Sequence, residues 1–202
     1  MSSVVKLLER AVIKCHEIHE HRMSEYFPGK GNGGIHEFNH VLTFIEALQN
    51  LSGYDNVVAW TEVQCLHKKR KRSARLDAAI KLKNENIIIL LEAKRIRQGK
   101  TRGSFNSSIA IKSIRNDTKR LIEIDESEPV VSASKTNAIY RVILASMWLS
   151  DDRNMQEAYE KWKSHDAFDI NWKGCVVSES VSKSTEKHLK LLLAVKIPHI
   201  KS

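Results

Sequence analysis

The sequence is poor in the residues that mark several classes of protein. It has only three cysteines, Cys15, Cys65 and Cys175, together with three prolines and eight glycines in 202 residues. Cysteines that are widely spaced and odd in number predict reduced thiols rather than a disulfide framework. Few Pro and Gly, together with a hydrophobic content of 42%, argue against a disordered chain. A chain of this length can bury a full core, so we expect one folded domain.

Long apolar segments, repeats and low-complexity tracts are also missing from the sequence. No apolar run approaches the length of a membrane span, and the N-terminus lacks the hydrophobic region of a secretory signal. We therefore expect a cytoplasmic protein with no membrane partner.

Positive charge, by contrast, is in excess. The 33 Lys and Arg residues outnumber the 24 Asp and Glu residues and leave a net charge of +9. The excess is densest in one short run made of Lys68, Lys69, Arg70, Lys71 and Arg72. Such a run suits a polyanionic partner, so we expect these five side chains to contact nucleic-acid phosphates, although a solvated loop has the same composition.

The hydrophobic pattern predicts an α/β fold: a single domain with a mixed central β-sheet flanked by helices. Within 1–202 we expect an N-terminal helical extension over 1–30, a core over 35–147, and a C-terminal helix and strand pair over 150–202. The predicted helices cover 35–51, 105–124 and 154–164, and the predicted strands cover 57–66, 138–149, 174–180 and 188–197. Two more strands flank a polar turn at 83–86.

These two strands carry the residues that best indicate a chemical function. In an extended chain alternate side chains share a face, so Glu92 and Lys94 point the same way while Leu91 and Ala93 point the other. The turn brings Asp77 back beside Glu92, with neighbouring strands about 4.8 Å apart. The run 87–91 before Glu92 is entirely apolar, which predicts a strand covered on both faces. Charged groups at the end of such a strand need a partner or a metal.

Asp77, Glu92 and Lys94 together form the layout of a metal-dependent phosphodiesterase site. Two carboxylates this close repel each other unless a cation lies between them, and oxygen ligands with room for water suit Mg²⁺ or Mn²⁺ better than Zn²⁺. The Lys94 ammonium can orient the attacking water and offset charge that builds on the phosphate. An exposed hairpin with solvated charges is the alternative interpretation.

The pattern resembles the PD-(D/E)XK nuclease superfamily, which includes restriction endonucleases. In that comparison Asp77 stands at the motif Asp, Glu92 at the D/E position and Lys94 at the Lys, while Leu76 replaces the motif Pro. The resemblance covers residues 35 to 147. It implies a restriction endonuclease-like core, in which a helix bearing a Glu precedes three strands, and it implies Mg²⁺-dependent cleavage of nucleic acid, with DNA as the expected substrate.

Further residues follow from this resemblance. Glu37 is the first choice for the helical Glu and Glu46 the second. The helix after the Glu-x-Lys strand flanks the active site in such nucleases, so its basic stripe, with Lys112 and Arg115, is a candidate nucleic-acid contact. Solvated charge remains the alternative for that stripe.

A second motif competes for Glu37. The sequence from His36 to His40 is H-E-x-x-H, which on a helix indicates a zinc metallopeptidase. However, Gly33 and Gly34 stand where that helix would already have begun, and no third zinc ligand is marked downstream. We therefore assign Glu37 to the nuclease-like core and treat the two histidines as incidental or DNA-facing.

Histidines also cluster near the N-terminus, where His16, His19 and His21 lie close together in a helical pattern. We expect this cluster to form the solvated face of an amphipathic helix rather than a metal site, because apolar residues recur on the other face, which ends at Ile18 or His19.

Three alternative functions stay open at this point. They are a non-cleaving nucleic-acid-binding protein of the same fold, the zinc metallopeptidase, and a protein-binding protein of the immunity type. The sequence leaves open DNA against RNA, endonuclease against exonuclease action, and whether the chain forms a homodimer.

Overall fold

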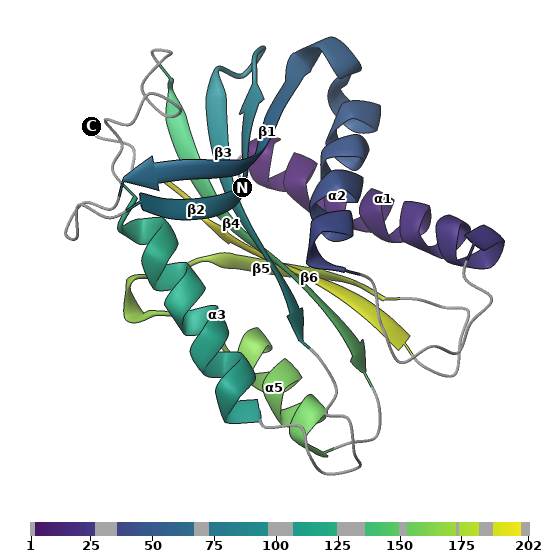
Figure 1. Ribbon diagram of the computed structural model, residues 1–202, viewed down its shortest axis with the longest axis vertical. Coiled ribbons are helices and arrows are strands. Elements are labelled where there is room, and N and C mark those ends of the chain that lie inside the picture. The colour runs from purple at the N-terminus through teal and green to yellow at the C-terminus, as the bar shows by residue number, and fades with distance from the viewer. Residues whose placement is uncertain are drawn as a thin grey trace.

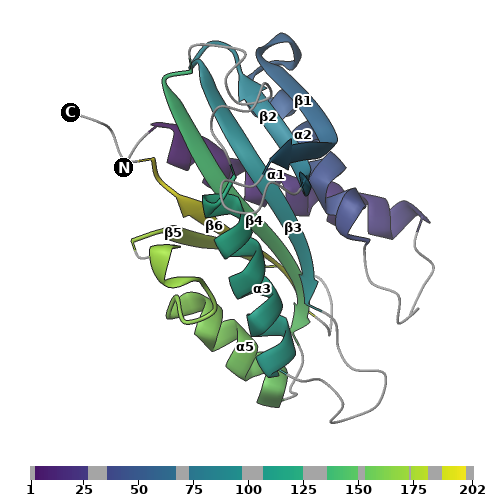
Figure 2. The same cartoon turned by 60° about the vertical axis from the view of Figure 1, so that its left-hand side comes forward.

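The computed structural model describes residues 3–26, 36–66, 73–96, 107–124, 136–149, 153–172, 174–181 and 188–198. These residues form a three-layer α/β domain (Figure 1). Helices α1 (Ser3–Tyr26) and α2 (Glu37–Ser52) cover one face of a sheet, and α3 (Ser107–Ile122) and α5 (Arg153–Lys163) cover the other (Figures 1 and 2). The expected single domain with a mixed sheet and flanking helices is confirmed.

The sheet has six strands in the order β1-β2-β3-β4-β6-β5. Their bounds are β1 Val57–Leu66, β2 Ser73–Leu82, β3 Ile87–Ile96, β4 Ala138–Leu149, β5 Val176–Val181 and β6 His188–Lys196. Only β3 and β4 are parallel, and α3 connects them; the other neighbouring pairs are antiparallel. The strand and helix positions expected from the sequence agree with these bounds to within about two residues, the usual uncertainty of element ends.

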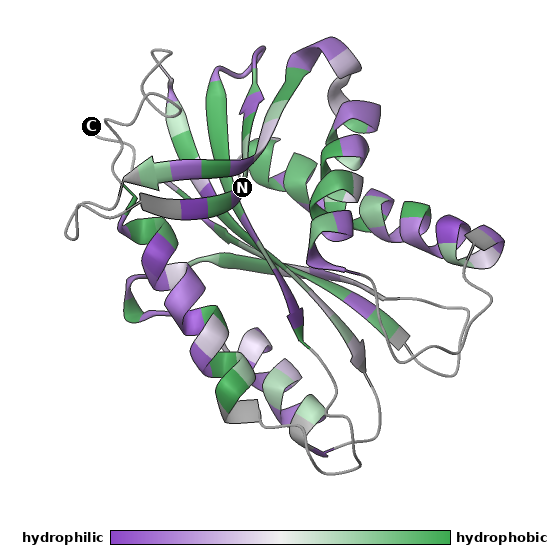
Figure 3. Cartoon of the chain, viewed as in Figure 1, coloured by the Kyte–Doolittle hydropathy of each residue, from purple (hydrophilic) through white to green (hydrophobic). Residues whose placement is uncertain are grey.

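Two hydrophobic cores lie on the two faces of the sheet. The first lies under α1 and α2 and includes the odd-numbered residues of β3 from Ile87 to Ala93. The second lies under α3 and α5 and includes Ile88 and Leu90 from the same strand. In Figure 3 the central strands are accordingly coloured mainly as hydrophobic, while the helices carry both colours. Strand β3 is therefore covered on both faces, as its apolar run predicts.

The turn between β2 and β3 is fixed by a buried side chain. Asn56 accepts a hydrogen bond from the Asn84 N–H at 2.7 Å and donates one to the Glu85 carboxylate at 3.1 Å. These contacts set the length of the turn at Lys83–Asn86, and with it the register of the two strands. The register pairs Ala79 with Leu90 and Ala78 with Leu91, so Asp77 comes opposite Glu92.

The β1–β2 hairpin changes direction at that same level. Glu62 has a φ of 58°, in the left-handed region that costs a residue with a side chain about 1–2 kcal/mol. The pairing between β1 and β2 skips Glu62 and Asp77 and resumes at Val63 and Leu76. Ala78 belongs to the core under α1 and α2, whereas Leu76, two residues away, belongs to the core under α3. The outer half of the hairpin is thus turned across the α3 face, as Figure 1 shows.

The histidines of α1 differ from the sequence-based expectation. His16 and His19 are only 2% and 3% exposed, whereas His21 is exposed. Helix α1 contacts α2 on one side and β5 and β6 on another, so its buried surface is wider than a single apolar stripe. The expectation of a solvated face was wrong for His16 for that reason, and of the two candidates for the end of the apolar face, Ile18 and His19, it is His19 that is buried.

Two other expectations concern the cysteines and the membrane. The three cysteines are free thiols and all are buried. No helix among the described residues is long and apolar enough to cross a membrane.

Candidate active site

The candidate site lies where β2 separates from β3. Hydrogen-bonded pairing between the two strands ends at Ala78 and Leu91. Beyond that point β2 continues beside β1, and β3 continues beside β4 as far as Ile96. Asp77 and Glu92 are the first residues past the last pair, so they stand at the base of a fork in the sheet.

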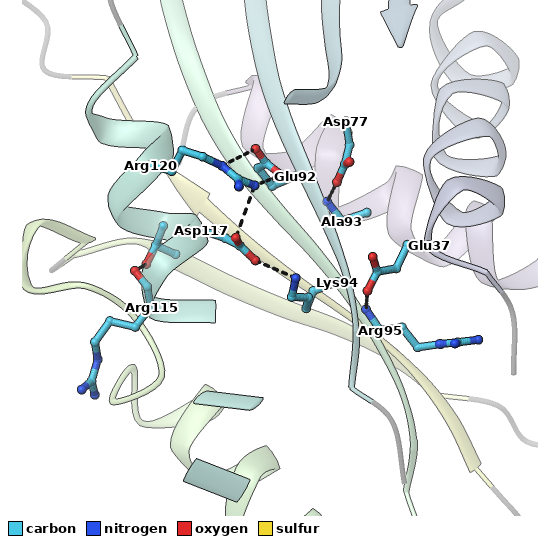
Figure 4. Close-up of polar contacts among 10 residues, drawn as sticks. Glu37, Asp77, Glu92, Ala93, Lys94, Arg95, Arg115, Asp117 and Arg120 are labelled. Atoms are coloured by element: carbon cyan, nitrogen blue, oxygen red, sulfur yellow. Dashed lines mark hydrogen bonds and ion pairs between the residues drawn. The ribbon is translucent and has the colours of Figure 1, made fainter. Parts of the chain in front are cut away.

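Separation of the strands leaves backbone N–H groups of β3 without a partner strand, and two carboxylates take that place. The Ala93 N–H donates to Asp77 Oδ2 at 2.6 Å. The Arg95 N–H, two residues on, donates to Glu37 Oε1 at 2.7 Å (Figure 4). A buried N–H needs an acceptor, so these bonds both stabilise the fork and hold the two carboxylates along one edge of β3. Glu37 comes from the first turn of α2, which begins at the exposed cap His36.

Glu92 points from β3 toward α3 and is almost completely buried, at 3% side-chain exposure. Arg120 of α3 holds it with two contacts, from Nε to Oε1 at 3.1 Å and from Nη2 to Oε2 at 2.6 Å. The pKa of the Glu92 carboxyl is raised to about 8, because burial and the Asp77 charge both raise it and Arg120 offsets only part of their effect. Burial likewise raises the pKa of Asp77, against the effect of the Ala93 N–H and of a hydrogen bond with the Glu92 carboxyl.

Lys94 lies on the same face of β3, two residues beyond Glu92. Its Nζ is 3.0 Å from Oδ2 of Asp117, a buried residue of α3. Burial by itself would lower the pKa of the Lys94 ammonium, but the attraction of Asp117 outweighs it and the pKa is raised. Asp117 Oδ1 also lies 3.3 Å from Arg120 Nη2, so one carboxylate forms ion pairs with both cations (Figure 4).

The groups around the fork carry an excess of negative charge. The acidic members are Glu37, Asp77, Glu92 and Asp117, and the basic members are Lys94 and Arg120. With every group ionised the set has two more negative than positive charges, which equals the charge of one divalent cation. Burial raises the pKa of both Glu92 and Asp77, and a neighbouring carboxylate adds to this effect, namely Asp77 beside Glu92 and Glu37 beside Asp77.

The donor set fits Mg²⁺ or Mn²⁺. Asp77 and Glu92 would be its side-chain ligands, and both supply oxygen. Mg²⁺ is commonly bound by one or two carboxylates and keeps several waters, so it does not need a cage of protein ligands. Among the described residues, no group of three or more His, Cys, Asp or Glu side chains is arranged to hold a metal ion, so a zinc-type ligand set is not found there.

Of the two candidates for the helical Glu, the structure brings Glu37 to the site. Glu46, the second choice, instead pairs with Arg22 of α1 at 2.6 Å. The HExxH motif does not form one metal-binding face. His36 caps the helix from outside, with its Nδ1 accepting the Phe38 N–H at 3.3 Å, while His40 is buried with its Nδ1 3.0 Å from His19 Nε2. Of the two interpretations of these histidines, incidental or DNA-facing, the burial of His40 excludes the DNA-facing one for that residue.

The basic candidates lie apart from the fork or outside the described residues. Lys112 and Arg115 are exposed on α3, as expected. Arg115 donates to the Asp166 carbonyl at 2.7 Å and points away from Lys94 and Glu92 (Figure 4). The basic run from Lys68 to Arg72 falls outside the described residues.

Asp117 and Arg120 were missed by the sequence analysis. Asp117 lies three residues after Ile114 and four before Leu121, both buried, so an acidic residue stands within the apolar stripe of α3. A charge at such a position requires a partner. That signal is in the sequence, but the pattern alone does not say which strand residues the stripe would meet.

The chain was also compared with known proteins. Neither the family models, nor the curated proteins, nor the solved structures contain a match to it.

Proposed function

We propose that this protein is a divalent-metal-dependent nuclease with a PD-(D/E)XK type of active site, acting on DNA. The observation that carries the proposal is the meeting of Asp77, Glu92, Lys94 and Glu37 at the fork between β2 and β3. These residues come from three separate elements, and the charge they carry in excess suits a divalent ion. The net charge of +9 supports a polyanionic substrate.

Each residue then has a role set by its position. Asp77 and Glu92 would hold Mg²⁺ or Mn²⁺, which supplies Lewis-acid activation of water and of the scissile phosphate. The Lys94 ammonium would orient the attacking water and stabilise negative charge on the phosphate, and Asp117 keeps that ammonium in place. Glu37 fixes the free edge of β3 through the Arg95 N–H.

Glu92 is already held by a cation in this structure. Both of its oxygens contact the Arg120 guanidinium, so a divalent ion has to compete with Arg120 for the same carboxylate. Such charge-assisted contacts are the stronger class of hydrogen bond.

The proposal is tested by incubating the purified protein with supercoiled DNA, linear DNA, single-stranded DNA and RNA, each with Mg²⁺, with Mn²⁺ or with EDTA. We expect cleavage of DNA that requires the divalent ion. Asp77→Asn keeps the size of the side chain and an acceptor for the Ala93 N–H but removes the charge, and it should abolish cleavage. Asp55→Asn, at an exposed position before β1, is the matched control and should cleave normally. Cleavage in EDTA, or by Asp77→Asn, would refute the proposal.

A second candidate function is nucleic-acid binding without cleavage. It is favoured by the pairing of Glu92 with Arg120 and of Lys94 with Asp117, since these contacts satisfy the charges without a metal. In that case the wild-type protein would bind DNA with the same affinity in Mg²⁺ and in EDTA and would leave it intact.

A further inference from the structure

An exposed tryptophan lies on the same face of the sheet as the candidate site. Trp60 of β1 is 72% exposed. Its neighbours in the strand, Val57 and Ala59, face the core under α1 and α2, so Trp60 points to the opposite face. That is the face on which Glu92 and Lys94 point toward α3.

The register of the sheet fixes how far Trp60 is from the fork. Trp60 pairs with Ala79, and Ala79 pairs with Leu90, so the three residues form one row across the sheet. Asp77 and Glu92 form the next row, two residues further along β2 and β3. From the strand spacing and the rise per residue, the backbone of Trp60 is roughly 8 Å from that of Asp77.

One basic side chain and one exposed apolar side chain share the face of the sheet that carries Trp60. Lys81 of β2 points to the same face as Ala79 and pairs with the exposed Val58. Strand β1 is an edge strand of the sheet, and the exposure of Trp60 leaves its ring accessible from solvent. A large aromatic ring with a lysine nearby, on the face of a site for phosphodiester chemistry, matches the way proteins bind unpaired bases.

We propose that Trp60 is a stacking platform for an unpaired base of the substrate, so that the enzyme acts on nucleic acid with a single-stranded segment. This inference rests on the proposed nuclease function. Successive nucleotides of one stacked strand are about 3.4 Å apart along the helix axis, and they are further apart when the strand is extended. A base on Trp60 therefore places a phosphate one or two nucleotides away at Asp77.

The test measures binding in the Asp77→Asn background, where the substrate is not cut. Fluorescently labelled oligothymidylate, oligouridylate and a blunt DNA duplex of equal length are titrated with protein at one fixed salt concentration. We expect tighter binding of the single strands than of the duplex. Trp60→Ala should weaken single-strand binding by about 5- to 150-fold, the range that corresponds to loss of one base–aromatic contact. Trp60→Phe should keep most of the affinity, and duplex binding should not change.

Two controls make the result specific. Ile13→Ala removes an exposed apolar side chain from α1, on the other side of the sheet, and should leave binding unchanged. Intrinsic fluorescence supplies a second readout, because among the four tryptophans Trp162 and Trp172 are buried, Trp148 is only partly exposed, and Trp60 is 72% exposed. Single strands should quench the fluorescence of the Trp60 protein and have much less effect on Trp60→Phe.

Unchanged single-strand affinity in Trp60→Ala would overturn the stacking proposal and leave the nuclease proposal standing. Loss of a dimer in Trp60→Ala, with nucleic-acid binding intact, would mean that Trp60 packs against a second copy and would also overturn it. Failure of the wild-type protein to bind or cut any nucleic acid would instead remove the nuclease proposal itself.

Discussion

Among the described residues, two clusters of buried polar side chains can be compared: one lies between α1 and α2, and the other lies where β2 leaves β3. In the first, His19 and His40 contact each other through ring nitrogens 3.0 Å apart, and burial lowers the pKa of His19 to about 4. In the second, burial raises the pKa of Glu92 to about 8, and charged partners surround it. Burial thus favours the neutral form of His19, and at the fork it likewise penalises the ionised form of Glu92, where the Arg120 cation acts against it.

The two clusters also differ in whether the surrounding backbone N–H groups are already hydrogen-bonded within a helix or strand pair. The histidine cluster lies between packed helices whose own N–H groups are already bonded within the helix. At the fork, pairing between two strands stops, and the carboxylates of Asp77 and Glu37 replace the missing strand. Of the HExxH motif, His40 therefore lies in the histidine cluster and His36 is exposed, while Glu37 lies at the fork with Asp77, Glu92 and Lys94.

The largest expected effect is on the rate of cleavage, which should depend on Glu92 at the fork and not on the HExxH residue His36. Glu92→Gln should abolish cleavage, because an amide is a poor ligand for Mg²⁺ and the ion would no longer be held against the phosphate. His36→Ala changes an exposed cap residue and should leave cleavage nearly as in the wild-type protein. The measurement is the initial rate on the best substrate at saturating Mg²⁺. A severe loss in His36→Ala with full activity in Glu92→Gln would reverse the assignment.

Lys94 should have the next largest effect. Lys94→Ala removes the ammonium that we propose to orient the water and stabilise the transition state, so kcat should fall by roughly a hundredfold or more while KM changes little. Asp117→Asn leaves Lys94 in place without its partner and should have a smaller effect on kcat. Lys14→Ala, at an exposed site on α1, is the matched control. Full activity in Lys94→Ala would exclude Lys94 from the chemistry.

Substitution of Arg120 tests whether its guanidinium competes with a divalent ion for the Glu92 carboxylate. Removing the guanidinium by Arg120→Gln removes both a competitor and a positive charge, so Mn²⁺ should bind more tightly, by about tenfold for a loss of about 1.4 kcal/mol of competing interaction. The titration is done at pH 9, above the pKa of about 8 for Glu92, to limit competition by protons. Arg115→Gln, on the same helix, should bind Mn²⁺ as the wild type does. Weaker binding by Arg120→Gln would mean that Arg120 supports the ion rather than competing with it.

The smallest effect is on the pH dependence of the free energy of unfolding, to which His19 and Glu92 contribute with opposite signs. His19 has a lowered pKa in the folded state, so the unfolded chain binds more protons between pH 6.5 and 4 and stability falls as the pH falls through that window. The loss is at most about 3 kcal/mol, and His19→Gln should remove it. Glu92 has a raised pKa, so the folded chain binds more protons between pH 4.5 and 8 and stability falls as the pH rises.

Thermal unfolding in EDTA across this pH range measures both contributions. Adding Mg²⁺ should raise the melting temperature more at pH 8 than at pH 5, because the ion takes the place of a proton at Glu92. Mg²⁺ should not change the loss of stability at acid pH that His19→Gln removes. Equal stabilisation by Mg²⁺ at both pH values would contradict the raised pKa of Glu92.

Much of the fold could be predicted because its signals are local. The alternation in β2 and β3 and the polar turn at 83–86 place Asp77 opposite Glu92 without knowledge of the rest of the molecule. The kink at Glu62 could not be predicted, since its left-handed backbone follows from how the hairpin packs across α3. The contacts of Asp117 and Arg120 depend on how α3 lies on β3, and the burial of His16 and His19 depends on β5, β6 and α2.

The central claim is that the fork, and not the histidine motif, is the metal site, and calorimetric titration with Mn²⁺ tests it most directly. The wild-type protein and His36→Ala should each bind one ion, and Asp77→Asn and Glu92→Gln should lose that binding while remaining folded by circular dichroism. The account would be contradicted if Asp77→Asn and Glu92→Gln kept the wild-type affinity, or if His36→Ala alone lost the ion.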